Sequence, residues 1–446
     1  MNDNHSLWRA GITLAVGLGL TTTLVACDLK VSNPGPVADA FLDDTAAHSA
    51  IVYGAARALN NALGAGQGSN FGVCGAVVSR EWYPSGQTGS YSCSVNEFRN
   101  LLTPSDASEV DRGQQARWLA EQAVIRIQTA RGDAGFNAWS LAPLALLYAG
   151  YANRLLGENV CATVIDGGPQ LKFTIHFARA DSAFTRALAL AQAQKNTQYQ
   201  FAALAGRASV RIWEGDWPGA MADAAQVPAT FVFSSPYNIV DANQYNSIEY
   251  ATSSAAGHRN FSSFNTFYGD NFDQFNDPRT PYVKSPAISF KVGTGSLPDL
   301  GDGKGAVGPV PYWQQMKYQT PSDPIRLSSG HEAMLIVAEG KLRAGDAAGA
   351  LAIINQIRTA VGVTPRQATT VADTWTALKL EKLIELWLEA RAVGERRRWN
   401  GAGVDPAAPG TLPANLSMTD RTGKNDCWPI SLNESQTNPH LNGNAP

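Results

Sequence analysis

The cysteines of this 446-residue chain are the residues whose chemistry can be stated most directly, beginning with Cys27. Cys27 ends the stretch Leu24-Val25-Ala26-Cys27, in which small residues come just before the cysteine. This pattern is typical of a bacterial lipobox. In such precursors the thiol is alkylated with a diacylglyceryl group, and cleavage then makes the cysteine the first residue. A plain secretory signal followed by a chance cysteine is the alternative.

The segment before Cys27 is apolar from Ala10 to Ala26 but is interrupted by three threonines. A membrane-spanning helix needs about 20 mostly apolar residues, so this shorter run fits the apolar region of a signal peptide better. We expect residues 1–26 to be a lipoprotein signal peptide, 27–40 a lipidated tether and 41–446 one domain. Acyl chains such as palmitate would then anchor the protein to a membrane. Asp28 leaves open which bacterial membrane that is.

Four further cysteines permit two disulfides, with three possible pairings in an exported chain. Cys74 and Cys93 flank a loop rich in Gly, Ser and Tyr, so we expect these two to pair. Cys161 and Cys427 form the remaining pair, which would tie the C-terminal tail to the body. No Cys-x-x-Cys occurs, which argues against a zinc or thioredoxin-like site.

Two short motifs resemble catalytic sequences but fail at one position each. His331-Glu332 begins the zinc-protease pattern His-Glu-x-x-His, but Leu335 stands where the second histidine is required. Residues 301–305, GDGKG, resemble a phosphate-binding loop, but Gly305 replaces the Ser or Thr that must follow the lysine. The six histidines are scattered and predict no Ser-His-Asp arrangement.

Two groups of carboxylates could come together. The first is Asp270, Asp273 and Asp277, which could hold calcium but lack the spacing of an EF-hand loop. The second is Glu381, Glu385 and Glu389, which share one strip of a predicted helix. As catalytic carboxylates they would have to line a cleft. We expect them instead to pair inside the fold with Lys382, Arg391 and the cluster 396–398. The sequence thus predicts no catalytic residue, no metal site and no cofactor.

Composition points away from charged partners. The formal net charge is −3, which implies no basic face for nucleic acid. Charged residues make up 16% of the chain, below the roughly 25% of ordinary soluble domains. The surface must therefore be built largely from Asn, Gln, Ser, Thr and Gly, which suits an extracellular protein that meets uncharged ligands.

Alanine-rich segments with helical periodicity predict a mainly α fold. The expected helices are 48–63, 114–130, 139–156, 176–194, 200–213 and LKLEKLIELWLEARA at 378–392. Two segments, 202–225 and 333–356, share a pattern in which Gly-Asp separates two helices and is followed two residues later by Gly-Ala. Glycine can end the first helix and aspartate can cap the second. This predicts tetratricopeptide-like helix pairs near 139–194, 200–226 and 331–360.

Residues 228–330 differ in composition from the helical segments. They are rich in aromatic, Asn, Ser, Gly and Pro residues and lack helical period, as do residues 64–100. A structureless loop of this length is unusual in a compact domain. We therefore expect 228–330 to form a loop-rich lobe with short strands, and we expect function on these loops rather than on the helical scaffold.

The order of motifs in the chain resembles the SusD/RagB family. The resembling segments are the lipobox, FNDPRTPY at 275–282, the block 324–362 that ends in Asn355-x-x-Arg358, LEKLIELWLEARAVGERRRWN, and the tail WPISLNESQTNPHL. Departures from the family pattern occur at Gly340, Lys382, Glu395, Arg396 and Ser431. They fall at scaffold positions and indicate a divergent member.

The resemblance implies an outer-membrane lipoprotein at the cell surface. Members of the family bind a nutrient, an oligosaccharide or polysaccharide and in some cases a peptide, and deliver it to a SusC-like TonB-dependent transporter. They are not known for catalysis. A peptide-binding member of the family, a non-catalytic scaffold lipoprotein and a surface glycoside hydrolase remain as alternatives.

A neutral-glycan site needs aromatic rings for the apolar faces of sugars, with polar groups nearby for their hydroxyls. The candidates in the two loop-rich regions are Trp82, Tyr83, Tyr91, Tyr268, Tyr312, Trp313 and Tyr318, with Phe264 and Phe267 as further options. Burial of several of these rings under their own loops is the alternative. The tryptophans at helical spacing, such as Trp118 and Trp387, are expected in the core.

Overall fold

The computed structural model describes residues 39–66, 68–85, 93, 95–252, 260–288, 310–416 and 425–442. The predicted signal peptide, Cys27, Tyr91 and the GDGKG segment lie outside the described residues. The chain divides into two units, Met1–Leu42 and Asp43–Pro446. Of the first unit only the start of the 3₁₀ helix η1 (Asp39–Asp43) is described. No helix in the described part of the chain has the length and apolar character needed to cross a bilayer.

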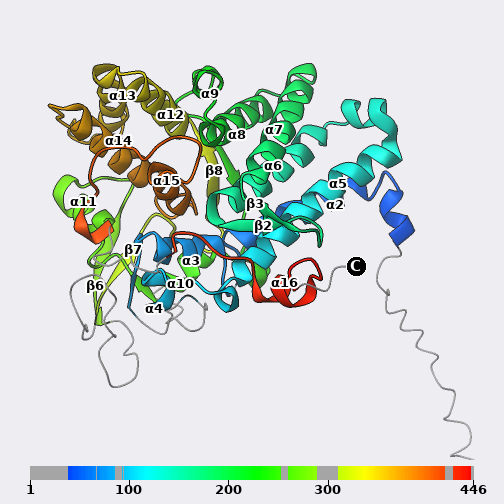
Figure 1. Ribbon diagram of the computed structural model, residues 1–446, viewed down its shortest axis with the longest axis horizontal. Coiled ribbons are helices and arrows are strands. Elements are labelled where there is room, and N and C mark those ends of the chain that lie inside the picture. Colours follow the sequence, from blue (N-terminus) through cyan, green and yellow to red (C-terminus); the bar gives the residue numbers. More distant parts are fainter. Residues whose placement is uncertain are drawn as a thin grey trace, which may run out of the picture. The chain divides into compact units, whose positions relative to one another are not determined.

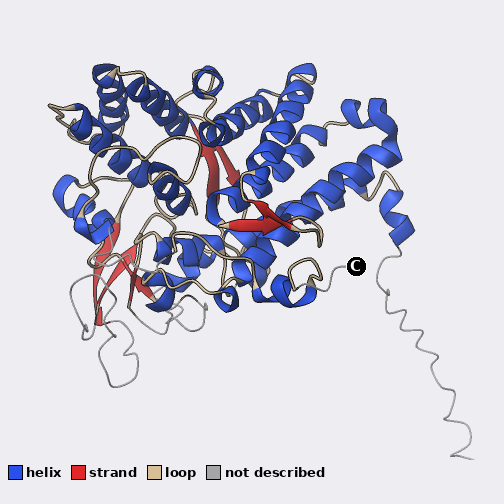
Figure 2. Ribbon diagram, viewed as in Figure 1, coloured by secondary structure: helices blue, strands red, loops and turns tan. Residues whose placement is uncertain are grey.

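The second unit is mainly helical, with a few short strands (Figure 2). The helices before the loop-rich lobe are α2 (His48–Leu63), α3 (Phe71–Val78), α4 (Val95–Phe98), α5 (Ser108–Ala138), α6 (Ala142–Asn159), α7 (Ile175–Ala193), α8 (Thr197–Glu214) and α9 (Trp217–Ala224). Those within it are α10 (Ser247–Thr252) and α11 (Phe267–Phe275). Those after it are α12 (Gly330–Arg343), α13 (Ala347–Ala360), α14 (Val371–Glu385), α15 (Ala392–Trp399) and α16 (Leu432–Thr437). The mainly α fold predicted from the sequence is confirmed.

Four antiparallel pairs of short strands lie in the part of the chain that the structure describes. They are β1 (Tyr83–Pro84) with β5 (Phe261–Ser262), β2 (Ala162–Val164) with β3 (Gln170–Lys172), β4 (Val232–Ser235) with β8 (Ile325–Ser329), and β6 (Tyr282–Ile288) with β7 (Pro311–Gln315). The β4–β8 pair joins the two ends of the segment 228–330. The described parts of this segment contain short strands, as predicted for the loop-rich lobe.

The repeated Gly-Asp pattern forms the turns of two helix pairs, α8–α9 and α12–α13. Gly215 and Gly345 have φ of 77° and 87°, the left-handed region that glycine adopts without strain. Asp216 and Asp346 then cap the second helices by accepting the backbone N–H groups of Gly219 and Gly349. A Cβ on Gly219 would lie 2.0 Å from the Asp216 carboxylate, which explains the second glycine of the pattern.

A third pair, α6–α7, packs beside α8 (Figure 1). Phe184 of α7 fills the space over two glycines, since a Cβ on Gly150 of α6 or Gly206 of α8 would lie within 2.6 Å of its ring. The glycines thus let the phenylalanine ring press against the backbones of both neighbours, and close packing of this kind stabilises helices beyond their local propensity.

The long helix predicted over 378–392 is wrong at its C-terminal end. Helix α14 stops at Glu385, and the chain turns through Leu388 and Ala390, which have φ of 58° and 60°. This conformation is costly for residues with a Cβ and persists where the surroundings hold it. Here buried Glu81 accepts the Leu388 N–H at 2.5 Å, and the Trp387 indole donates to the Glu81 carbonyl. A tertiary contact overrides the helical periodicity.

Both disulfides form with the predicted pairing, Cys74–Cys93 and Cys161–Cys427. The second joins the end of α6 to the C-terminal segment, where Trp428 exchanges backbone hydrogen bonds with Asn159 and Cys161. The C-terminal tail is thereby tied to the helical body.

A candidate ligand site in the loop-rich lobe

An aromatic cluster lies where β6 pairs with β7. We call it the Trp313 cluster and define it as Phe264, Phe272, Tyr282, Lys284 and Trp313. Trp313 stacks on Tyr282, with ring centroids 5.1 Å apart and planes 12° from parallel. Phe264 meets Trp313 edge-on at 5.2 Å. The strand register places Lys284 opposite Trp313, and its Nζ lies 4.6 Å from the indole ring centre.

The Trp313 cluster keeps part of its surface in contact with solvent. Trp313 and Phe264 are half-buried and Lys284 is exposed, whereas Tyr282 is buried beneath them. The Tyr282 hydroxyl donates to Asp273 at 2.6 Å, which fixes its ring. Burial and the Asp273 carboxylate together raise the pKa of Tyr282, so this hydroxyl stays a donor. The cluster combines a rigid aromatic surface with a cation and a carboxylate at its edge.

Five of the seven predicted ligand-contacting aromatics are core residues, and that part of the prediction needs correction. Trp82, Tyr83, Tyr268, Tyr312 and Tyr318 are each at most 3% exposed. Tyr83, Tyr268 and Tyr312 lie in β1, α11 and β7, and the bulky rings of all five fill space against neighbouring hydrophobic residues. Burial under the loops, the alternative left open by the sequence, holds for these five.

Specific contacts hold the buried rings. Trp82 stacks on Phe261 at 4.9 Å, and Tyr268 stacks on Trp387 at 5.5 Å. The hydroxyls of Tyr312 and Tyr318 donate to the backbone carbonyls of Thr252 and Leu388. These rings join segments distant in sequence, so they stabilise the lobe from within.

Of the six predicted aromatics that the structure describes, Trp313 is the one that is not fully buried. Sequence reasoning missed Phe272, Tyr282 and Lys284 as members of its surroundings. The available signal was the Asp-Pro-Arg motif at 277–279, because a turn there folds the strand carrying Tyr282 and Lys284 back along α11.

Buried ion pairs connect the lobe to α14. Arg279 of the Asp-Pro-Arg turn pairs with Glu381 at 2.7 Å and Glu385 at 3.4 Å. Arg326 of β8 pairs with Glu385 at 2.8 Å and Glu389 at 2.5 Å. Burial alone would raise the pKa of Glu385, but the His331 hydrogen bond and the charges of Arg326 and Arg279 outweigh it and lower that pKa.

The glutamates therefore pair inside the fold, as expected, but with other partners than predicted. Lys382 and Arg398 instead pair with Glu339 and Glu395, at 2.5–3.0 Å. Arg391 pairs with Glu158 and Glu332. Glu381, Glu385 and Glu389 are at most 3% exposed and form ion pairs with basic side chains. They therefore line no cleft in which a substrate could react.

The three aspartates considered for calcium have separate partners. Asp270 accepts from the Asn415 amide, Asp273 from Tyr282 and Lys284, and Asp277 from Arg279. In the described part of the chain, metal-ligating atoms converge at Cys74, Cys93 and Glu109, and there the two cysteines form a disulfide.

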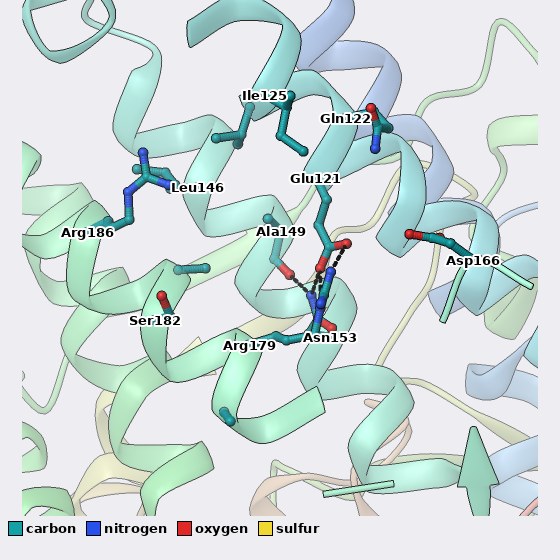
Figure 3. Close-up of a pocket in the computed structure, with 13 residues that line it drawn as sticks. Glu121, Gln122, Ile125, Leu146, Ala149, Asn153, Asp166, Arg179, Ser182 and Arg186 are labelled. Carbon is teal, nitrogen blue, oxygen red and sulfur yellow. Dashed lines mark hydrogen bonds and ion pairs between the residues drawn. The ribbon is translucent and has the colours of Figure 1, made fainter. Parts of the chain in front are cut away.

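A pocket lies among α5, α6 and α7 and has a volume of about 460 Å³ (Figure 3). Glu121 at its centre accepts two hydrogen bonds from Arg179, at 2.9 and 2.6 Å, and one from Asn153 at 2.9 Å. Ser182, Arg186 and Ile125 line its walls (Figure 3). No aromatic side chain lines this pocket, and its central charges are already paired, so it offers a sugar ring no stacking surface.

Comparison with known proteins shows what the chain is similar to. Residues 314–446 match the model of the SusD family. A SusD/RagB family protein from Bacteroides thetaiotaomicron shares the fold, with a TM-score of 0.60 and 13% identity over 88% of this chain and 94% of the other. A SusD-like carbohydrate binding protein from Bacteroides fragilis gives a TM-score of 0.60 and 13% identity over 90% of this chain and 100% of the other. No curated protein sequence matches the chain.

The resemblance to the SusD/RagB family found in the sequence motifs is confirmed. The matched region contains the block 324–362, the segment LEKLIELWLEARAVGERRRWN and the tail WPISLNESQTNPHL. Over the rest of the chain the similarity is one of fold, because 13% sequence identity establishes the architecture alone.

Proposed function

We propose that this SusD-like chain is a carbohydrate-binding lipoprotein of the bacterial cell surface that delivers an oligosaccharide or polysaccharide to a SusC-like TonB-dependent transporter. The observation that carries the proposal is the half-exposed Trp313 ring in a rigid cluster. A solved structure with the same fold, from Bacteroides fragilis, is described as carbohydrate binding, which supports the proposal.

The Trp313 cluster can recognise a sugar without breaking a bond. The apolar C–H face of a pyranose would lie on the accessible part of Trp313 and Phe264, and stacking on Tyr282 holds the indole in place beforehand. Lys284 and Asp273 would supply a donor and an acceptor for hydroxyls at the rim. Affinity would then come from buried apolar area and a few hydrogen bonds.

The binding test uses residues 28–446 expressed without lipid and titrated with soluble polysaccharides while tryptophan fluorescence is followed. Trp313→Ala should weaken binding of a neutral glycan by about tenfold or more, since an aromatic contact of this kind contributes on the order of 1–2 kcal/mol. Trp118→Ala is the matched control, because Trp118, which its helical spacing predicted in the core, is instead 47% exposed on α5, in the helical body. Equal losses in both variants would count against the Trp313 site.

Saturable binding of peptide digests, with no response to any glycan, would favour a peptide-binding member of the family. Release of smaller saccharides by the purified protein would contradict a purely binding role.

The proposed anchor has its own test. Cells that express the full chain should incorporate labelled palmitate, and Cys27→Ala should abolish the label and release the protein from the membrane fraction. Digestion of the protein by protease added to intact cells would support the outer surface. Protection from protease would instead point to an inward-facing leaflet, the outcome that Asp28 leaves open.

A further inference from the structure

A second pocket lies apart from the Trp313 cluster, on the surface formed by the ends of α11 and α13, the segment 362–370 and the first half of α14. It has a volume of about 360 Å³. We call it the Arg358–Arg366 pocket after the two guanidinium groups that line it. Phe275 and Asp373 line it as well.

The two guanidinium groups that line this pocket share one ion-pair partner, Glu381. Arg358 Nη1 pairs with Glu381 at 3.0 Å, Arg366 Nε with the same carboxylate at 3.3 Å, and Arg279 Nη2 also with Glu381, at 2.7 Å. Three guanidinium groups therefore share one carboxylate. Asp277 at 2.8 Å and Glu385 at 3.4 Å also compensate Arg279. No matching anion of this kind lies beside Arg358 and Arg366 among the described ion pairs.

Two donors at the pocket make no hydrogen bond. The Nη2 atoms of Arg358 and Arg366 are buried, and neither has a hydrogen-bond partner among the described residues. Arg358 is 0% exposed, and the side chain of Arg366 is 15% exposed. A buried guanidinium N–H without an acceptor carries a desolvation cost, which an incoming acceptor would remove. Burial also lowers the pKa of Arg366, consistent with a cation that lacks full compensation.

The two arginines are held in place before any ligand arrives. Asn355 accepts the Arg366 N–H at 2.7 Å and donates to the Arg366 carbonyl at 3.0 Å, which fixes the segment that carries Arg366. The Phe275 ring lies 5.0 Å from the Arg358 guanidinium and 5.9 Å from that of Arg366. Arg358 Nε donates to the Thr364 carbonyl at 2.7 Å.

We propose that the Arg358–Arg366 pocket binds an oxyanion, such as the carboxylate of an acidic sugar, a sulfate or a phosphate. Planar guanidinium groups match the oxygen geometry of these ions and bind them with charge-assisted hydrogen bonds. The proposal concerns a second site and does not depend on the Trp313 cluster.

One carboxylate at the pocket opposes an anion. Asp373 is exposed at the rim, and its Oδ2 accepts from Thr370 N at 3.0 Å and Thr369 Oγ1 at 2.9 Å as part of the N-terminal cap of α14. Its charge is therefore directed to the helix terminus but still reduces the positive potential of the pocket. This gives the site one residue whose neutralisation should strengthen binding and one whose neutralisation should weaken it.

The test titrates residues 28–446 by isothermal calorimetry with sulfate, phosphate, acetate, galacturonate and neutral galactose, at constant ionic strength set with chloride. We expect saturable binding of at least one oxyanion. Arg366→Gln should weaken it by about tenfold, the effect of one charge-assisted hydrogen bond. Asp373→Asn should leave it unchanged or strengthen it. Arg126→Gln makes the same charge change on α5, remote from the pocket, and should have no effect.

The arms of the experiment distinguish the sources of the anion. Tighter binding of galacturonate than of acetate, with no response to galactose, identifies an acidic saccharide, and preference for sulfate or phosphate identifies a free or esterified inorganic anion. Absence of saturable binding for all four anions overturns the proposal, as does an equal loss in Arg126→Gln and Arg366→Gln. If Arg366→Gln fails to fold, weaker binding in Asp373→Asn overturns it instead.

Discussion

The tetratricopeptide-like helix pairs and the loop-rich lobe reach a defined structure by different routes. In α8–α9 and α12–α13, each turn is specified within five residues by a glycine with positive φ and an aspartate cap. In the lobe, order depends on residues far away in sequence, above all on the contacts of Arg279 and Arg326 with α14. Local rules therefore specify the turns of the helix pairs, whereas contacts with α14 hold the lobe.

This difference matters for ligand binding, because the Trp313 cluster lies on the part that local sequence does not determine. The rigidity of the Trp313 cluster depends on the contacts that hold Tyr282 in place. Asp273 holds Tyr282, and Arg279, three residues before Tyr282 in the chain, pairs with Glu385. Mutations in each region should therefore differ in how far their effects spread.

The largest effect is expected for Glu385→Ala. This change leaves Arg326 and Arg279 partly buried without their shared partner, which typically costs about 3–5 kcal/mol. Hydrogen exchange should show lost protection in 260–288 and 310–329 before α7 and α8 are affected. Asp181→Asn is the matched control, because its ion pair with Arg211 joins half-exposed groups of α7 and α8 and should be worth at most about 1 kcal/mol. Uniform loss of protection would contradict the division into two regions.

Removal of the Cys161–Cys427 disulfide should come next, at about 2–4 kcal/mol by urea unfolding. The two cysteines are 266 residues apart, whereas Cys74 and Cys93 are 19 apart. In the chain-entropy account the longer loop gains more from a cross-link. The double variant Cys161→Ser/Cys427→Ser should therefore be less stable than Cys74→Ser/Cys93→Ser, and the reverse order would show that native-state contacts around the shorter disulfide dominate.

Glu109 predicts a pH dependence within the region of the first disulfide. Its pKa is raised to about 8, chiefly by burial; Glu97 and Asp106 add to the rise, and the backbone N–H of Glu109 and the charge of Arg112 oppose it. The folded state therefore favours the neutral acid. The stability that Glu109 contributes is complete below its unfolded pKa near 4.5 and is lost as the pH rises towards 8.

Glu109→Gln should remove this dependence and stabilise the protein at pH 8 by on the order of 2 kcal/mol, a value that allows for partial relaxation around the charge. At pH 4.5 the variant and the parent should have similar free energies of unfolding. An unchanged slope of stability between pH 5 and pH 8 in the variant would show that other groups set the dependence.

The smallest effects concern glycines of the helical region. Gly345→Ala places a Cβ at φ of 87° and should cost about 1 kcal/mol. Gly54→Ala lies within α2, where a Cβ meets nothing within 4 Å, and should stabilise the helix by up to about 1 kcal/mol. Thermal unfolding of the two variants should therefore shift in opposite directions. Shifts of the same sign would contradict the role assigned to the Gly-Asp turn.

Patterns of short range were predicted correctly. The helix at 48–63 matches α2, and the Gly-Asp turns and both disulfide pairings are as expected. Such features depend on residues one to four positions apart, or on a small choice among four cysteines.

The candidate ligand site was predicted less well. Trp313 is half-exposed, but five other rings are core residues, because a sequence of aromatics and turn residues looks the same whether its rings face inward or outward.

By itself, the sequence determined the helical scaffold, its turns, the pairing of its cysteines and the resemblance to a family. These follow from local periodicity, caps and motif order. Only the tertiary structure decided where α14 ends, which arginines Glu381, Glu385 and Glu389 bind, and which aromatic ring stays accessible. The physical reason is that burial and ion pairing depend on segments tens to hundreds of residues apart. The chain turn at 386–390 is set by Glu81, more than 300 residues earlier.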